Sequence, residues 1–260
     1  MGRLRRGLGP ATRELALIAA LYLFYCAART AASSDLRAAT ARATQLRRLE
    51  RVLHLPGEGW FNRLATDHAW VGVTADYWYA SLHYLVTAGA LVWLFGRGRT
   101  TYVHARRALV LATLVALGFY LTLPTAPPRM MDGFTDIMAL HSDLGWWGSS
   151  GSAPQGLGGL TNELAALPSM HAGWALWVAL AIWSVTASRL LRWLGVVYAL
   201  GTDVVVVVTA NHWLVDVVLG QAIIAAAWWV VHRTPSAPRP ARVPGEVAQP
   251  TNRYAATPAP

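Results

Sequence analysis

The sequence predicts an all-α, polytopic membrane protein with six transmembrane helices and one amphipathic helix at the membrane interface. Of its 260 residues, 55% are hydrophobic and only 13% are charged, and the mean hydropathy is +0.35. This composition is too apolar for an ordinary soluble domain. Six apolar segments also approach the length of about 20 residues with which a helix crosses a bilayer. They run over residues 15–32, 70–95, 107–123, 171–187, 190–211 and 212–232.

The first apolar segment is the weakest of the six. Its unbroken apolar core runs only from Leu15 to Ala28, and the sequence AARTAASS that follows is also typical of a signal-peptidase site. We expect residues 1–32 to form an N-terminal transmembrane helix, with a cleaved signal sequence as the alternative. The lone cysteine, Cys26, lies in this segment, so an internal disulfide is excluded.

Residues 33–69 form a basic linker that contains six arginines. Five apolar side chains recur in it at roughly helical intervals: Leu36, Ala39, Leu46, Leu49 and Leu53. This pattern predicts a basic amphipathic helix that lies on anionic lipid headgroups. A solvated helix with no membrane contact is the alternative.

The distribution of arginine predicts the orientation in the membrane. All 22 basic residues are arginine, and the formal net charge is +9. The arginine-rich segments 1–7, 96–107 and 188–192 fall on one side of a six-span topology, which is therefore expected to be cytoplasmic. The arginines flank apolar runs and form no single stripe, so no nucleic-acid partner is expected. The Pro-rich tail, 233–260, reaches the same side and has the composition of a disordered segment.

Polar motifs interrupt the outer ends of the spans in the predicted five-helix catalytic domain, residues 70–232. They are LPTAPPRMM at 123–131, LPSMHAGWA at 167–175 and TANHWLVD at 209–216. The topology brings all three to the same, extracytoplasmic face of the cell membrane. Ionisable groups at membrane depth are costly and are usually kept for function. The three motifs therefore predict one site where a lipid headgroup meets the bilayer.

The third motif contains a histidine and a carboxylate four residues apart, His212 and Asp216. On a helix these residues share one face. A carboxylate there can accept a hydrogen bond from one imidazole nitrogen and leave the other as a nucleophile or base. A buried His–Asp pair that only stabilises packing is the alternative.

The second and first motifs supply groups suited to phosphate. His171 follows Pro168 and Ser169 at the expected start of a helix, where unpaired N–H groups attract anions. Ser169 can donate to the same anion, and His171 is placed to protonate a leaving oxygen. Arg129 can bind phosphate oxygens in a bidentate manner.

Three further features have two readings each. His83 and Tyr79 lie one turn apart in the second span and either position substrate or stabilise the bundle. Asp203 is either a protonated core carboxyl or the partner of an arginine. The Gly- and Trp-rich loop 133–159 is either a lid over the lipid entrance or a flexible connection.

The three motifs, quoted as LPTAPPRM, LPSMHAGWA and NHWLVDVVLG, resemble the signature motifs of the type 2 phosphatidic acid phosphatase superfamily of membrane lipid phosphatases. Within it, the sequence is most similar to the inositol phosphotransferase branch, which is related to fungal inositol phosphorylceramide synthase. The similarity spans roughly residues 60–230 and includes DYWYASLHYLVTAGALVWLF in the second span.

The resemblance implies a role for each matching residue. His212 attacks phosphorus and forms a phosphohistidine, and Asp216 orients it. His171 protonates the departing lipid alkoxide and then activates water or an acceptor alcohol, while Arg129 binds the phosphate. The resemblance implies no metal and no cofactor, and no cluster of His, Cys and Asp has plausible ligand spacing.

Two departures from the phosphatase motifs bear on the substrate. The position six residues before His212 is Val206, where the phosphatases carry arginine, and the lysine that begins their first motif is absent. Either other groups, such as Asn211 and backbone amides, replace these cations, or the donor is a less charged phosphodiester. The second reading favours a phosphotransferase with an alcohol acceptor.

The sequence leaves the lipid open. Phosphatidic acid, a polyprenyl phosphate, phosphatidylinositol and a ceramide-like acceptor all fit. A membrane transporter or channel that uses the His–Asp pair as a proton relay is the alternative function. That alternative predicts internal repeats and polar groups distributed through several spans at mid-depth, whereas the sequence shows no repeat and its polar groups cluster at one end.

Overall fold

The computed structural model describes residues 9–30, 35–55, 57–148 and 162–233. Within these residues the regular structure is helical, apart from one isolated bridge between Thr125 and Ala165. The N-terminal arginines at 1–7 and the tail beyond Arg233, which is predicted to be disordered, lie outside the described residues, as does 149–161 of the predicted lid. The prediction of an all-α protein is confirmed for the described part of the chain.

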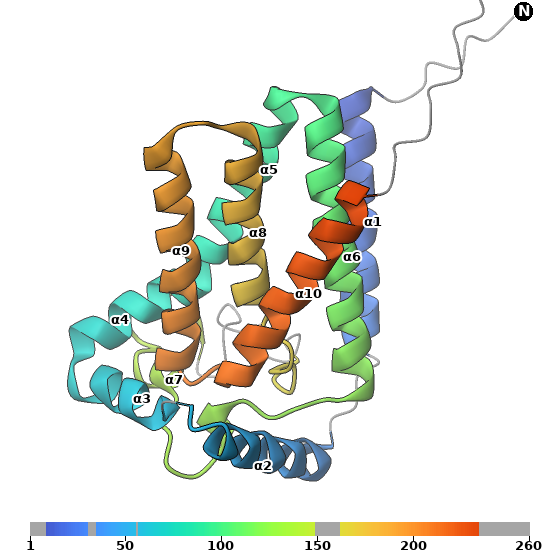
Figure 1. Ribbon diagram of the computed structural model, residues 1–260. Helices are drawn as coiled ribbons and strands as arrows, with labels where there is room; N and C mark the ends of the chain where they lie inside the picture. The colour runs from blue at the N-terminus through green and yellow to red at the C-terminus, as the bar shows by residue number, and fades with distance from the viewer. Residues whose placement is uncertain (1–8, 31–34, 56, 149–161, 234–260) are drawn as a thin grey trace, which may run out of the picture.

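Most of the helices run alongside one another, and the remaining elements lie at one end of this bundle (Figure 1). The elements of the bundle are α1 (Pro10–Thr30), α4 (Ala69–Tyr77), the π-helical turn η1 (Trp78–Leu82), α5 (His83–Arg97), α6 (Arg99–Thr122), α8 (Met170–Val185), α9 (Arg189–Val208) and α10 (Leu214–Arg233). The end elements are α2 (Leu36–Val52), α3 (Glu58–Asp67), the 3₁₀ turn η2 (Pro128–Met130) and α7 (Ile137–Leu140).

Four helices are long and apolar enough to cross a membrane, judged by length and composition. They span Ala69–Arg97, Arg99–Thr122, Arg189–Val208 and Leu214–Arg233. The segment predicted at 171–187 forms α8, an apolar helix of 16 residues. The segment predicted at 15–32 forms α1, which begins at Pro10 and is not among the four. That α1 and α8 also cross the membrane, which would give six spans, remains a prediction.

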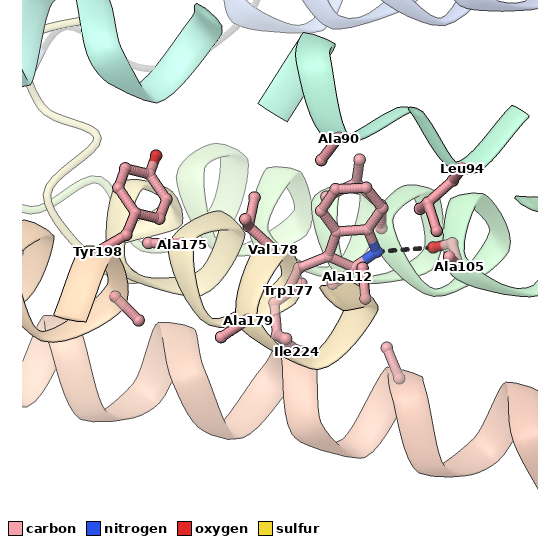
Figure 2. Close-up of a cluster of buried hydrophobic side chains, with 14 of the residues drawn as sticks. Ala90, Leu94, Ala105, Ala112, Ala175, Trp177, Val178, Ala179, Tyr198 and Ile224 are labelled. Atoms are coloured by element: carbon pink, nitrogen blue, oxygen red, sulfur yellow. Dashed lines mark hydrogen bonds between the residues drawn. The ribbon is translucent and has the colours of Figure 1, made fainter. Parts of the chain in front are cut away.

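Helix α8 occupies the centre of the bundle, where it packs against α5, α6, α9 and α10. Its Trp177 is fully buried, and the indole Nε1 donates a hydrogen bond of 2.7 Å to the backbone oxygen of Ala105 (Figure 2). Alanines surround this indole, and small residues allow helices to approach closely. The packing of α8 fixes the position of its N-terminus, which carries the second motif.

Arginines stack on aromatic rings at the end of the bundle opposite to α2. The guanidinium carbon lies 4.8 Å from the ring centre in Arg97–Trp93, 4.8 Å in Arg192–Trp183 and 4.2 Å in Arg233–Trp229. Trp side chains prefer the membrane interface, and arginine marks the cytoplasmic side. The orientation of the bundle in the membrane remains a prediction.

Helix α2 lies across the other end of the bundle (Figure 1). Its small side chains Ala39 and Ala43 are fully buried against Trp213, just before α10. Two of its arginines, Arg42 and Arg47, donate to backbone oxygens of the loop that follows α6. The amphipathic helix predicted in the linker thus forms, but its alanine face is docked on protein.

The predicted leucine stripe of α2 is divided between two environments. Leu46 packs against the same cluster as Ala39, whereas Leu36, Leu49 and Leu53 are exposed. The exposed leucines are available to a membrane surface, and contact with headgroups remains a prediction.

The described part of the predicted lid is anchored to α4. His141 Nδ1 lies 2.8 Å from Oδ2 of Asp76, and both side chains are buried. Gly72 makes this approach possible, because a Cβ there would collide with the imidazole of His141. Trp147 is fully buried nearby and donates to the backbone oxygen of Met138 at 3.0 Å. Residues 133–148 are therefore a packed segment and not a flexible connection.

Candidate active site

The third motif begins in the turn that ends α9. The backbone N–H groups of Asn211 and His212 both donate to the oxygen of Val206, at 3.1 Å each, and Ala210 adopts a positive φ of 54°. This is the hydrogen-bond pattern of a helix C-terminus closed by a left-handed residue. Helix α10 begins only at Leu214. His212 therefore precedes the helix, and the expectation that it shares a helical face with Asp216 is wrong.

A backbone carbonyl is the nearest partner of His212. The imidazole Nδ1 lies 2.8 Å from the oxygen of Ala166 and 3.7 Å from Oδ2 of Asp216. A carbonyl oxygen only accepts hydrogen bonds, so Nδ1 carries the proton and Nε2 has the free lone pair. The hydrogen-bond partner of Nδ1 is therefore the backbone oxygen of Ala166 and not the carboxylate expected from the sequence. Asp216 lies beyond hydrogen-bond distance but close enough to act through its charge.

Asp216 connects the second and third motifs through its side chain and its backbone. It is fully buried, and its Oδ2 accepts from the N–H of Trp213 at 2.8 Å. Its backbone oxygen accepts from the N–H of Ser169 at 2.9 Å. Asp216 therefore connects the two segments that carry His171 and His212 by hydrogen bonds.

Two glycines permit this close approach of α8 and α10. A Cβ on Gly220 would collide with the backbone oxygen of Ser169, and one on Gly173 would lie 2.9 Å from the oxygen of Gly220. Ser169 itself is fully buried and caps α8, because its Oγ accepts from the N–H of Ala172 at 3.4 Å. The residues before it include a cis peptide bond between Leu167 and Pro168.

His171 lies in an aromatic stack that reaches the π-helical turn η1. Its ring centre is 4.1 Å from that of Tyr79, with planes 17° apart, and 4.2 Å from that of His83. The ring centre of His212 lies 5.9 Å from that of His171. Local π-helical turns inside α-helices are frequent at functional sites. Here the turn lies between α4 and α5 and presents two residues of one span to His171.

The stack contains nitrogen atoms that the described protein leaves unpaired. His171 Nε2 and His83 Nδ1 are buried and have no hydrogen-bond partner among the described residues. Buried polar atoms without a partner are uncommon, and each calls for an explanation. The structure brings His83 and Tyr79, predicted as substrate-binding residues, into contact with His171.

Arg129 is held by the protein on three sides. Its backbone N–H donates to the oxygen of Ala210 at 2.9 Å, and its Nη1 donates to Oδ1 of Asn211 at 3.0 Å. Its Nε lies 3.2 Å from Oδ2 of Asp136. The side chain of Arg129 is 8% exposed, and its guanidinium lies next to the turn that carries His212. Asn211, proposed from the sequence as a substitute for a missing cation, contacts this arginine.

Three buried polar residues of the outer helices were missed in the sequence. Asn62 of α3 donates to the backbone oxygens of Val208 and Thr135. Glu50 of α2 and Glu58 of α3 accept from backbone N–H groups at the start of α10. A signal for Glu50 exists in hindsight, because it continues the buried face of Ala39 and Ala43 along α2. No comparable pattern points to Asn62.

Two other predictions concern Asp203 and metals. Asp203 accepts a hydrogen bond of 2.7 Å from Nε2 of Gln221, so its partner is an amide and not an arginine. No group of three or more His, Cys, Asp or Glu residues in the described ranges is arranged to hold a metal ion.

The chain was compared with known protein families, curated proteins and solved structures. The sequence profile of the PAP2 superfamily matches residues 44–230, a range that includes all three motifs and helix α2 from Thr44 onward. No curated protein and no solved structure matches the chain significantly. The family match covers well over half of the sequence, and it shows that this chain belongs to the PAP2 superfamily.

Proposed function

We propose that the protein is a metal-independent membrane enzyme that transfers or hydrolyses a lipid-linked phosphate through a covalent intermediate on His212. Members of the PAP2 superfamily are typically phosphatases, which supports a phosphatase or phosphotransferase type of function. The observation that carries the proposal is the hydrogen bond from His212 Nδ1 to Ala166 O, because it leaves Nε2 as the free nucleophilic nitrogen.

The first chemical step would form the intermediate. Nε2 of His212 attacks phosphorus, the bond between phosphorus and the lipid oxygen breaks, and His171 donates a proton to that oxygen. Asp216, 3.7 Å from His212, would offset the positive charge that develops on the phosphorylated imidazole. Arg129 would bind the phosphate oxygens through Nη2, since Nε and Nη1 face Asp136 and Asn211.

The second step would release the phosphate. Water or an alcohol gives a proton to His171 while its oxygen attacks phosphorus, and the P–N bond breaks to regenerate His212. A phosphomonoester donor then gives inorganic phosphate with water and a new phosphomonoester with an alcohol. A phosphodiester donor keeps its second substituent on phosphorus, so it gives a phosphomonoester with water and a new phosphodiester with an alcohol. His171 thus acts first as an acid and then as a base.

Two observations support a phosphodiester donor and an alcohol acceptor, as in the inositol phosphotransferase branch. Val206, which stands where the phosphatases carry arginine, is fully buried in an apolar cluster. The first N–H groups of α10 are bonded to carboxylates and are not free for phosphate. Fewer cations and amides are then available for a dianionic phosphomonoester. We propose transfer between lipids on the extracytoplasmic face of the cell membrane.

A transporter or channel with a His–Asp proton relay is not favoured. The family match indicates an enzyme, and the buried histidines gather at one end of the bundle.

The proposal is tested with the full-length protein in liposomes that contain EDTA. Phosphatidic acid, phosphatidylinositol and polyprenyl diphosphate are each offered with and without acceptor alcohols, and free phosphate and new phospholipids are followed together. Phosphate release that is lost in His212→Ala identifies a phosphatase. A new phosphodiester that is lost in the same variant identifies a transferase. Turnover of any of these lipids that survives His212→Ala contradicts the proposed intermediate.

A further inference from the structure

Three carboxylates converge on three successive backbone N–H groups at the start of α10. Oδ2 of Asp216 accepts from the N–H of Trp213 at 2.8 Å, and Oε1 of Glu58 from that of Leu214 at 3.3 Å. Oε1 of Glu50 accepts from the N–H of Val215 at 2.9 Å. Asp216 belongs to α10 itself, whereas Glu50 and Glu58 come from α2 and α3, about 160 residues earlier in the chain. The outer helices are thus attached to the turn directly after His212.

Both glutamates are buried in a place that offers little compensation for two negative charges. Glu50 is 4% exposed and Glu58 is 6% exposed. Neither forms an ion pair with an arginine within 4.0 Å in the described ranges. The positive end of the α10 dipole amounts to roughly half a charge, and it is shared with Asp216. Two or three ionised carboxylates here would repel one another strongly.

We infer that Glu50 is protonated and that Glu50 and Glu58 together clamp α2 and α3 onto the first turn of α10, which positions His212. The importance of positioning His212 rests on the proposed function, whereas the clamp itself does not depend on it. Oε1 of each glutamate accepts from a backbone N–H group. Oε2 of Glu50 is buried and has no hydrogen-bond partner among the described residues. A proton on this carboxyl removes one of the two charges and leaves both backbone contacts intact.

The acidity of Glu50 agrees with this arrangement. Burial, reinforced by the side chain of Glu58, raises its pKa from 4.5 to about 8. The N–H of Val215 lowers the pKa, and the charges of Glu58 and Asp216 raise it. Four neighbouring side chains have other partners: His212 contacts the oxygen of Ala166, Arg129 contacts Asp136, and Arg47 and Arg51 contact the backbone oxygens of Asp132 and Arg47.

The clamp predicts an effect of pH on the amides of residues 213–215. Below the pKa of Glu50 the proton on this residue keeps the clamp closed. At pH 9.5 Glu50 is ionised, the carboxylates beside it repel its charge, and the clamp opens. Glu50→Gln mimics the protonated carboxyl, because its amide keeps one accepting oxygen and carries no charge. Glu50→Ala removes the acceptor at every pH and leaves the N–H of Val215 without its partner.

The experiment is hydrogen–deuterium exchange of the full-length protein in nanodiscs, read on peptides that cover 209–217 at pH 6.5 and 9.5 and corrected for intrinsic exchange. We expect the wild type to exchange at least about tenfold faster at pH 9.5, Glu50→Ala to be fast at both values and Glu50→Gln to be protected at both. Glu163→Gln, a partly exposed carboxyl elsewhere at the same end, is the matched control and should follow the wild type.

Two results would overturn the inference. One is protection of residues 213–215 that is equal in wild type and Glu50→Ala at both pH values. The other is Glu50→Gln behaving as Glu50→Ala, since this would mean that the carboxyl acts through its charge. Exchange is measured without turnover, so this test stands even if the proposed reaction fails. Where turnover is found, the clamp predicts that Glu50→Gln extends kcat to higher pH and leaves KM unchanged.

Discussion

Nε of Arg129 lies 3.2 Å from Oδ2 of Asp136, so a carboxylate of the outer loop holds the guanidinium of the first motif. Asn211 accepts from Nη1 of the same group at 3.0 Å. In the proposed function, Nη2 of this guanidinium binds the phosphate. Because an arginine that is fixed beforehand loses little freedom on binding, this contact is expected to raise the affinity for phosphate.

Asp136→Asn is therefore expected to weaken binding of orthovanadate, a phosphate mimic, by about tenfold. The carboxylate accepts from both Arg129 and the N–H of Ala139, whereas an uncharged amide has only one accepting oxygen for these two donors. Binding is measured as competitive inhibition of turnover. Asp143→Asn, an exposed carboxyl of the same loop, is the control. Tighter binding of vanadate to Asp136→Asn would show that this carboxylate competes with phosphate for the arginine.

The two histidines should respond differently to the leaving group. For a lipid alcohol, both His171→Ala and His212→Ala should lower kcat by at least about a hundredfold. The p-nitrophenolate of a p-nitrophenyl phosphate ester leaves without a proton, so this substrate should restore the first step, seen as a burst of p-nitrophenol, in His171→Ala and not in His212→Ala. The rates of phosphate or p-nitrophenol release measure this directly. Equal rescue of both variants would mean that the roles of acid and nucleophile are assigned wrongly.

Gly220→Ala should separate α8 from α10. The new Cβ would collide with the backbone oxygen of Ser169, which is a rigid group and not a flexible side chain. We expect a loss of ~2 kcal/mol or more in stability and a large loss of activity. Gly118→Ala is the matched control, because nothing lies within 4 Å of its added Cβ. Thermal unfolding in detergent compares the two, and similar midpoints would contradict the predicted collision.

Ala210→Gly should stabilise the turn before His212. Ala210 has a φ of 54°, a conformation that glycine adopts without the steric cost of a Cβ. We expect a gain of about 1 kcal/mol in stability or less, since glycine also gains freedom in the unfolded chain. Chemical denaturation measures the change. A loss of stability above the error would show that the methyl group, which is fully buried, contributes more packing than the backbone costs.

Stability should fall as pH rises through the range in which Glu50 titrates. The pKa of Glu50 is raised from 4.5 to about 8, so the folded protein binds this proton more tightly than the unfolded chain does. The contribution of Glu50 to the free energy of unfolding is therefore greatest at low pH, decreases between about pH 4.5 and about pH 8, and is constant above that. Melting temperatures across this range measure it. Glu50→Gln should flatten this decrease, and an unchanged slope in that variant would assign it to other groups.

Much of the fold could be predicted because apolar segments of membrane length are a strong signal. Each of the six predicted segments corresponds to a helix, and four meet the requirements of a span by length and composition. The end of α9 was placed too late, at 211 instead of Val208, because a left-handed alanine leaves no mark in a hydrophobic pattern. The helical face shared by His212 and Asp216 was wrong for the same reason.

The sequence alone determined which residues are proposed to carry chemistry: three motifs, with His171, His212 and Arg129 among them. Only the tertiary structure decided how these residues are held, because their partners are backbone atoms and distant side chains. The oxygen of Ala166, the aromatic ring of Tyr79 and the carboxylates of Glu50 and Asp136 reach the site through long-range packing. Such contacts depend on where helices cross, and no local spacing encodes that.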